Sequence, residues 1–438
     1  MAERTPPCQR IGPIVQGTRF AGILGAAPAR RVWLAGVAVG VVRWLELLAF
    51  ALWALEATGS ALAVASLALA RLLPLLLLAV PLSAFLEGRD RRRVMLAATG
   101  AMAATSALML GAVLLGRPSL PLLLVAALAN GIFWTVEQPV RRTLFLETAG
   151  LERAGAAMGL ETLSNQGTRL LGSVAGGAAI ELLGLPGVFA IALALYAAAL
   201  LGLARVGAGA GPRGSSRRPD RHGLLAGVRL VLGDRLLLGT VLVTLVYNIW
   251  GFPFVALAPV LAEKSLGLSP FATGLLVAMD GVGGLLAGLA IIGLGRPAWF
   301  RRIFTLGCGL LSVGILLLAL SGRPVPAALA LLLAGLGMAG FATMQTVIPI
   351  LAAPAELRLR VQGVVTTAIG VSPFGFLNAG WLGERLGPER ALLVMGVCGL
   401  LALVLIVWRL PGMLALRPPG PEPRDPARSE GPTGEGAG

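Results

Sequence analysis

Apolar stretches long enough to cross a membrane alternate with short polar stretches along most of the chain. A helix needs about 20 mostly apolar residues to span the hydrocarbon layer, where every backbone polar group has to be bonded within the segment. Twelve such stretches can be counted, at residues 32–55, 61–86, 94–115, 120–140, 156–183, 186–206, 236–261, 270–294, 303–320, 326–351, 361–382 and 391–408. The pattern predicts an all-α membrane protein of about twelve transmembrane helices.

One polar segment divides these stretches into six and six. Residues 207–222 read GAGAGPRGSSRRPDRH, a composition that cannot bury an apolar face. We therefore expect two six-helix bundles at 32–206 and 236–410, joined by a cytoplasmic linker at 207–235. From His222 to Leu232 the linker has the pattern of a short amphipathic helix at the membrane surface. Cytoplasmic tails are expected at 1–31 and at 411–438, the second of them disordered.

The formal net charge is +15, which by itself could indicate binding to nucleic acid, but the positive charges are concentrated in every second loop. An excess of Arg and Lys marks short cytoplasmic loops. The richer side holds Arg89, Arg91, Arg92, Arg93, Arg141, Arg142, Arg153, Arg296, Arg301, Arg302, Arg358 and Arg360, and the poorer side holds Arg117, Lys264, Arg323, Arg385 and Arg390. Both termini are thus expected on the cytoplasmic side of a plasma (inner) membrane. Nucleic acid is not an expected partner, because it requires basic side chains clustered on a water-exposed face.

Composition narrows the class of protein further. Hydrophobic residues make up 56% of the chain and charged residues 13%, far from the roughly 25% charged residues of soluble domains. Cys8, Cys308 and Cys398 lie far apart without metal-binding or redox spacing, and His222 is the single histidine. We expect no metal site, no cofactor and no enzymatic centre, and the lack of a Walker-type loop disfavours transport powered by ATP hydrolysis.

The loop after the second apolar stretch reads PLLLLAVPLSAFLEGRDRRRVML at residues 74–96. It resembles the cytoplasmic signature loop of the major facilitator superfamily, especially that of the drug and siderophore (enterobactin-type) exporter branch. The positions that match are Pro74, Pro81, Asp90, Arg91, Arg92 and Arg93, with Glu87 at the family's first Asp, Ser83 for its Gly and Gly88 for its Arg. The resemblance implies a gating loop, in which Glu87, Asp90 and the three arginines pair with neighbouring helix ends in one conformation only. The alternative is an anchor that only sets the topology.

A glycine-rich element in the fifth stretch carries a second resemblance. The sequence RLLGSVAGG at residues 169–177 is similar to the G-P-x-x-G-G element of exporters in this superfamily, with Gly172, Gly176 and Gly177 matching and Ser173 in place of the Pro. Such spacing lets two helices approach closely, which is also common in ordinary helix packing. A weaker similarity lies in EQPVRRTLFLE at residues 137–147.

Charged residues inside the apolar stretches are the candidate site, because an ionisable group in the hydrocarbon costs a few kcal/mol. They are Arg43, Glu46, Arg71, Glu137, Glu161, Arg169 and Asp280. We expect these groups to line a central ion and substrate pathway, with one carboxylate binding a proton and an arginine attracting an anionic group. Arg43 and Glu46, three residues apart, are expected to neutralise each other, whereas Asp280 has no partner within a turn. Structural pairing across helices is the alternative.

These observations predict a secondary transporter that exports drug-like or siderophore-like small molecules by alternating access, through proton antiport. Its partners would be the lipid bilayer, a small-molecule substrate and protons, and it would act as a monomer. A proton-coupled uptake symporter is the first alternative. A non-transporting membrane scaffold or sensor is the second, although it would gain nothing from the cost of buried charges.

Overall fold

The computed structural model describes residues 22–86, 89–150, 153–207, 221–294, 296–354 and 357–419. Within these ranges the chain is helical and contains no β-strand. Ten helices among the described residues are long and apolar enough to cross a membrane, with Arg235–Lys264 counted as one helix. The predicted all-α membrane fold is therefore confirmed.

The first half consists of α2 (Ala27–Thr58), α3 (Ala61–Leu86), α4 (Arg91–Leu114), α5 (Leu120–Ala149) and α6 (Ala154–Ala204). The last of these contains two spans. Gly184 interrupts it with a left-handed φ of 63°, and Pro186 lies just beyond the break. Glycine adopts positive φ without steric penalty, and proline lacks the N–H that would continue the helix. The fifth and sixth predicted stretches thus meet end to end in α6.

The second half consists of α7 (Arg221–Gly233), α8 (Arg235–Val246), the short π-helix η2 (Tyr247–Gly251), α9 (Phe254–Lys264), α10 (Pro270–Leu294), η3 (Pro297–Trp299), α11 (Phe300–Ala319), α12 (Pro324–Ala352), α13 (Arg358–Ile369), α14 (Ser372–Leu386), α15 (Pro388–Arg409) and η4 (Pro411–Leu414). The pair α13 and α14 forms one span broken before Pro373, since each piece alone is too short to cross. With this pair and the second part of α6, the ten helices become twelve spans.

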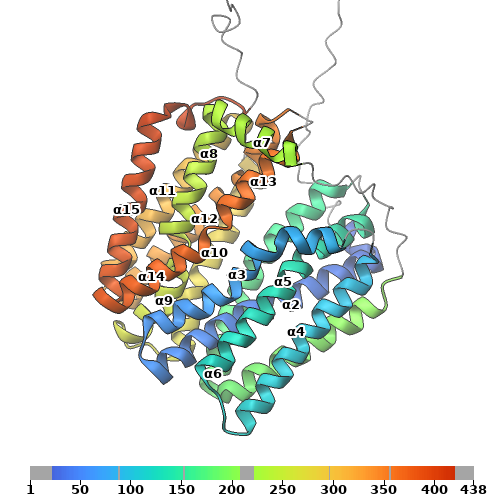
Figure 1. Cartoon of the computed structure of the whole chain (residues 1–438). Coiled ribbons are helices and arrows are strands. Elements are labelled where there is room, and N and C mark those ends of the chain that lie inside the picture. Colours follow the sequence, from blue (N-terminus) through green and yellow to red (C-terminus); the bar gives the residue numbers. More distant parts are fainter. Residues whose placement is uncertain are drawn as a thin grey trace, which may run out of the picture.

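The helices form two bundles (Figure 1). One contains α2 to α6 and the other α8 to α15, and they meet along α6 with α10 and along α3 with α14. We call the end of the molecule where α2 begins and α15 finishes the terminal end, and the opposite end the far end. The amphipathic α7 lies at the terminal end, beside α8 and α13 (Figure 1).

Several predicted boundaries differ from the structure, among them the end of α5, which lies at Ala149 rather than at residue 140. The first helix starts at Ala27 rather than at residue 32, because Pro28 is tolerated in a first turn, and Ile23 just before it is fully buried. The expectation of a disordered tail from Pro411 is wrong for residues 411–419. There η4 buries Met413 against Gly239, and Arg301 and Arg302 donate hydrogen bonds to backbone oxygens of Gly412 and Leu414. Residues 1–21, 208–220 and 420–438 lie outside the described residues.

Candidate functional site

A cavity of about 730 Å³ lies between the two bundles. Both halves line it, with α2, α3, α5 and α6 on one side and η2, α9, α10, α12 and α14 on the other. Solvent-exposed lining residues such as Arg142, Thr162 and Thr346 lie near the ends of α5, α6 and α12 that face the terminal end. Lining residues toward the far end, such as Ala51 and Val64, are buried. The cavity therefore opens at the terminal end.

Polar contacts between the halves close the far end. Glu384 of α14 accepts hydrogen bonds from Ser60 Oγ at 2.9 Å and from the backbone N of Leu62 at 3.4 Å. Lys264 of α9 donates to the backbone oxygen of Gly59, and Glu181 of α6 accepts from the backbone N of Phe271 at 2.7 Å. These contacts join residues of opposite halves that lie 90 to 324 positions apart in the sequence, so they exist only because the halves have closed here.

Glu46 is fully buried and is held by residues from three other helices. It accepts hydrogen bonds from Ser106 Oγ at 2.7 Å and Asn130 Nδ2 at 3.0 Å, and Arg71 Nη1 lies 3.9 Å away. The expected pairing of Glu46 with Arg43 is therefore wrong. Arg43 instead lies over the ring of Trp134, 5.0 Å from its centroid.

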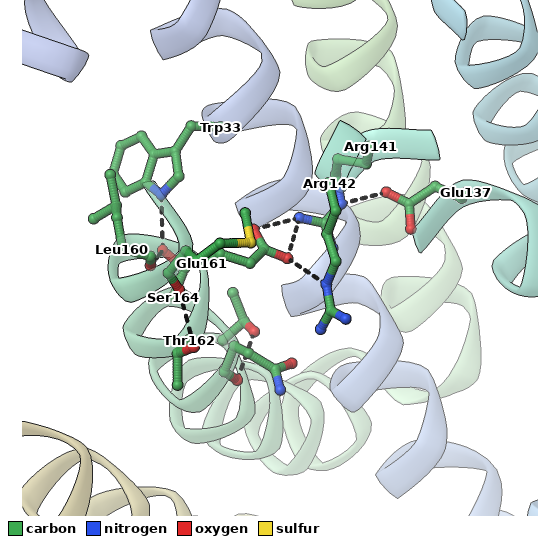
Figure 2. Close-up of polar contacts among 11 residues, drawn as sticks. Trp33, Glu137, Arg141, Arg142, Leu160, Glu161, Thr162 and Ser164 are labelled. Carbon is green, nitrogen blue, oxygen red and sulfur yellow. Dashed lines mark hydrogen bonds and ion pairs between the residues drawn. The ribbon is translucent and has the colours of Figure 1, made fainter. Parts of the chain in front are cut away.

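Arg141 is the centre of a second charge network (Figure 2). Its Nε donates to Glu137 at 2.6 Å, and its Nη1 donates to both carboxylate oxygens of Glu161 at 2.6 and 2.7 Å. Arg142 Nε lies 3.7 Å from the same Glu161 carboxylate. Arg141 was expected in a cytoplasmic loop because the predicted span ended at residue 140, although its spacing of four residues from Glu137 indicates a pair on a helix.

Close packing of the first span supports this network. Trp33 Nε1 donates to Ser164 Oγ at 2.7 Å, which ties α2 to α6 (Figure 2). A Cβ on Gly36 would lie 2.8 Å from the Arg141 side chain. Arg141 therefore passes across the glycine surface of α2 to reach Glu161.

Arg169 and Asp280 form a buried ion pair that joins the two halves. Arg169 Nε donates to Asp280 Oδ1 at 2.7 Å, and Nη2 donates to Oδ2, so the contact is bidentate. The guanidinium also lies over Trp44, 4.5 Å from the ring centroid. The partner that Asp280 lacks on its own helix thus comes from α6, in the other half.

The predicted pathway residues occupy two layers around the cavity. Arg43, Arg71, Glu161 and Arg169 line it directly. The other three carboxylates, Glu46, Glu137 and Asp280, are buried and are bonded or close to arginines. Arginines therefore form most of the charged surface of the cavity. Among the described residues, no group of three or more His, Cys, Asp or Glu side chains could hold a metal ion.

The charges of the predicted gating loop bind within the first half. Asp90 caps α4 by accepting hydrogen bonds from the backbone N of Arg92 at 2.9 Å and of Arg93 at 3.2 Å. Arg91 pairs with Glu147 at the end of α5, and Arg92 donates to backbone oxygens at the end of α6. A cation beside carboxyl-terminal carbonyls is favoured by the helix dipole. Glu87 lies outside the described residues.

The three glycines of the fifth span face two different helices. A Cβ on Gly172 would lie 2.5 Å from the Val41 backbone oxygen, and one on Gly176 would lie 2.8 Å from the Leu45 backbone oxygen, both on α2. A Cβ on Gly177 would lie 2.4 Å from the Pro270 oxygen of α10. The last glycine therefore sits at the contact between the halves.

The sequence profile of the Major Facilitator Superfamily matches residues 32–376. This chain belongs to that superfamily of membrane transporters. The match begins in the first span and runs through the break between α13 and α14 into α14, so it includes the cavity and the charge networks around it.

Solved structures of transporters share the fold. A variant of the nucleoside transporter NupG superposes with a TM-score of 0.68 at 11% identity, covering 88% of this chain and 99% of that one. A bacterial homologue of human drug peptide transporters gives 0.64 at 13% identity, covering 88% and 98%. A POT family transporter in complex with a thioalcohol-conjugated peptide gives 0.68 at 12% identity, covering 88% and 96%. No curated protein matches the sequence. Identities this low indicate the fold and leave the substrate open.

Proposed function

We propose that the protein exports small drug-like or siderophore-like molecules across the plasma (inner) membrane by alternating access, through proton antiport, as a monomer. The observation that carries this proposal is the cavity between the halves, which opens at the terminal end and is closed at the far end. A substrate can enter such a cavity from one side only, and rocking of the halves would expose it to the other.

Arginine placement supports a cytoplasmic terminal end. Arg142 lies at the end of α5 that faces this side, and Arg301 and Arg302 lie at the start of α11, beside η4. The far end has few basic residues, among them Arg117, Lys264 and Arg323. By the positive-inside rule the structure then represents an inward-facing state, ready to take up a substrate from the cytoplasm.

Asp280 is the proposed proton site. It is bonded to Arg169 of the other half, and so its protonation would weaken a contact between the halves rather than one within a half. Glu46, Glu137 and Glu161 are bonded within the first half, where protonation would have less effect on how the halves pack.

The export direction rests on the resemblance of the 74–96 loop and of Gly172, Gly176 and Gly177 to exporters. In the proposed cycle Asp90 and the arginines at 91–93 keep the ends of α4, α5 and α6 together, so that the first half moves as one body. Uptake by proton symport would use the same cavity and remains the alternative to be tested.

Transport by vesicles of known orientation tests the proposal. Everted vesicles with an acidic interior should accumulate compounds from a panel of lipophilic cations and anions, and a protonophore should abolish the accumulation. Asp280→Asn should lose gradient-driven accumulation by at least about tenfold and keep substrate exchange, whereas Glu389→Gln, an exposed carboxylate at the far end, should behave like the wild type.

Two other results would overturn parts of this proposal. Accumulation by right-side-out vesicles alone would show that the protein is an uptake symporter. Failure of every compound in both vesicle types, with a correctly inserted protein, would favour a membrane scaffold or sensor.

A further inference from the structure

Two arginines in the cavity wall donate no hydrogen bond to any residue that the structure describes. Arg43 of α2 is 9% exposed and Arg71 of α3 is 5% exposed, and both line the cavity. Arg43 Nε and Arg71 Nε and Nη1 are buried without a hydrogen-bond partner. A buried donor without an acceptor costs about 1–3 kcal/mol, and more when the group is charged. A ligand with acceptor atoms would recover part of this cost.

The other buried arginines of the site are already engaged. Arg141 is bonded to Glu137 and Glu161, and Arg169 is bonded to both oxygens of Asp280. Arg71 Nη1 lies 3.9 Å from Glu46, which is beyond hydrogen-bond distance, and Glu46 accepts from Ser106 and Asn130 instead. The unsatisfied donors are therefore confined to one part of the cavity wall.

The unpartnered buried atoms of this wall all have the same polarity. Besides the two arginines they are the indole Nε1 atoms of Trp44 and Trp134, and Trp134 lies under the Arg43 guanidinium. Every one of these groups is a hydrogen-bond donor. A ligand that enters this part of the cavity therefore meets N–H groups that have no acceptor in the described protein. The one carboxylate in the lining, Glu161, is occupied by Arg141 and Arg142.

Apolar and aromatic side chains make up most of the remaining surface, together with uncharged polar residues such as Gln138, Gln166 and Thr343. On the first half the apolar and aromatic residues include Leu47, Leu67 and Leu72, and on the second half Tyr247, Phe252 and Phe376. The carboxylate of Glu137 attracts the charge of Arg43, and the like charges of Arg141 and Arg71 repel it. An anion bound between Arg43 and Arg71 would relieve the repulsion between them, whereas a cation would add to it.

We propose that Arg43 and Arg71 form a binding site for the anionic head group of an amphipathic organic anion, whose apolar body lies against the second half. A carboxylate, sulfonate or phosphate group fits, because its oxygens can accept several hydrogen bonds from guanidinium and indole donors. This inference rests on the proposed function for its role in transport. It narrows the substrate class from small molecules in general to organic anions with an apolar body.

A matched pair of probes tests the site without requiring transport. Binding of naphthalenesulfonate and of its neutral amide, naphthalenesulfonamide, is measured by calorimetry on the full chain in phosphatidylcholine nanodiscs. We expect the anion to bind at least about tenfold more tightly than the amide. Arg43→Gln and Arg71→Gln should each weaken binding of the anion by about tenfold and leave binding of the amide unchanged.

Controls separate lost binding from lost structure. Arg117→Gln removes the same charge from an exposed loop and should change neither affinity. Arg71→Gln also removes a charge next to Glu46. Arg43 has no bond to that carboxylate, so Arg43→Gln provides an independent measurement. Arg43→Lys should restore part of the preference for the anion. Equal affinity of the wild type for both probes, or a preference that survives in the double variant, would overturn the site.

An anionic lipid could supply the same head group as a soluble molecule. Adding phosphatidylglycerol to the nanodiscs distinguishes them. If this lipid competes with naphthalenesulfonate in the wild type and not in the arginine variants, the site holds and its ligand is a lipid. If it does not compete, the site holds and takes a free anion.

The site and the proposed function can fail separately. Binding of the anion through both arginines without movement across vesicles would keep the site and overturn transport. Proton-coupled transport by a protein that binds both probes equally would keep the function and overturn the site.

Discussion

Arg43 and Arg169 carry the same charge and line the same cavity, yet their surroundings differ. Arg169 donates two hydrogen bonds to Asp280, whereas Arg43 lies over the face of Trp134 and donates no hydrogen bond to a described residue from its buried Nε. Removal of one partner of a buried ion pair is strongly destabilising, because it leaves the other charge buried and uncompensated. The two arginines should therefore respond differently to substitution.

Loss of either partner of the Arg169 and Asp280 pair should destabilise the protein. Asp280→Asn and Arg169→Gln should each lower the free energy of unfolding by about 3 kcal/mol, because each strands a buried group, and the double variant should lose less than the sum of the two. Unfolding of the purified protein in mixed detergent micelles measures this. Additive effects of the two substitutions would show that the pair contributes no coupling.

At the scale of elements, α6 joins the halves through a narrow strip of small residues. Gly172 and Gly176 bring α2 close, and Gly177 brings α10 close, where a Cβ on Gly274 would lie 2.5 Å from the Ser173 oxygen. A similar contact joins α3 and α14, where a Cβ on Gly380 would lie 2.5 Å from that of Ala65. Both contacts lie toward the far end, so they act on the closed side of the cavity.

Larger side chains at this strip should open the far end. Gly177→Leu or Gly274→Leu would overlap backbone atoms of the opposite helix, at a cost of about 1–3 kcal/mol in the present conformation only. In a variant without native cysteines, labelling of Ala51→Cys by an impermeant maleimide from the far side should rise about tenfold. Gly111→Leu, where the added group has open space, is the control. Unchanged labelling in both the Gly177 and the Gly274 variants would show that the contact between α6 and α10 does not keep the far end closed.

At the scale of the whole molecule, the contacts that seal the far end are weaker than the bonds within each half. The contacts that seal the far end include exposed polar pairs such as Ser60 with Glu384, and exposed pairs contribute little, about 0–1 kcal/mol each. The bonds within each half are more buried. If the halves rock as proposed, we therefore expect them to separate at the far end while each bundle stays intact.

With twelve spans, both termini are expected on one side of the membrane. Reporter domains fused at residue 1, at residue 438 and within 208–220 should all be cytoplasmic, and reporters in the loops at Arg117 and Gly322 should be on the opposite side. Activity of fluorescent and periplasm-dependent reporters measures this. A reporter at 438 on the side opposite to residue 1 would exclude an even number of spans.

Hydropathy by itself determined the helices, because the membrane requires every span to be long and apolar. The predicted limits 61–86 and 270–294 agree with α3 and α10. Local chemistry also indicated the break between the fifth and sixth spans, where Gly184 and Pro186 interrupt the helix. These features depend on residues that are neighbours in sequence.

The partners of the buried charges were decided only by the tertiary structure. Asp280 and Arg169 lie 111 residues apart, and Glu46 is held by Ser106 and Asn130 rather than by the nearby Arg43. The same holds for Met413, which a Pro-rich segment carries back onto Gly239. Hydropathy fixes which segments enter the membrane, whereas the partner of a side chain depends on how separate helices pack. That packing also leaves buried nitrogens of Arg43 and Arg71 at the cavity without an acceptor among the described residues.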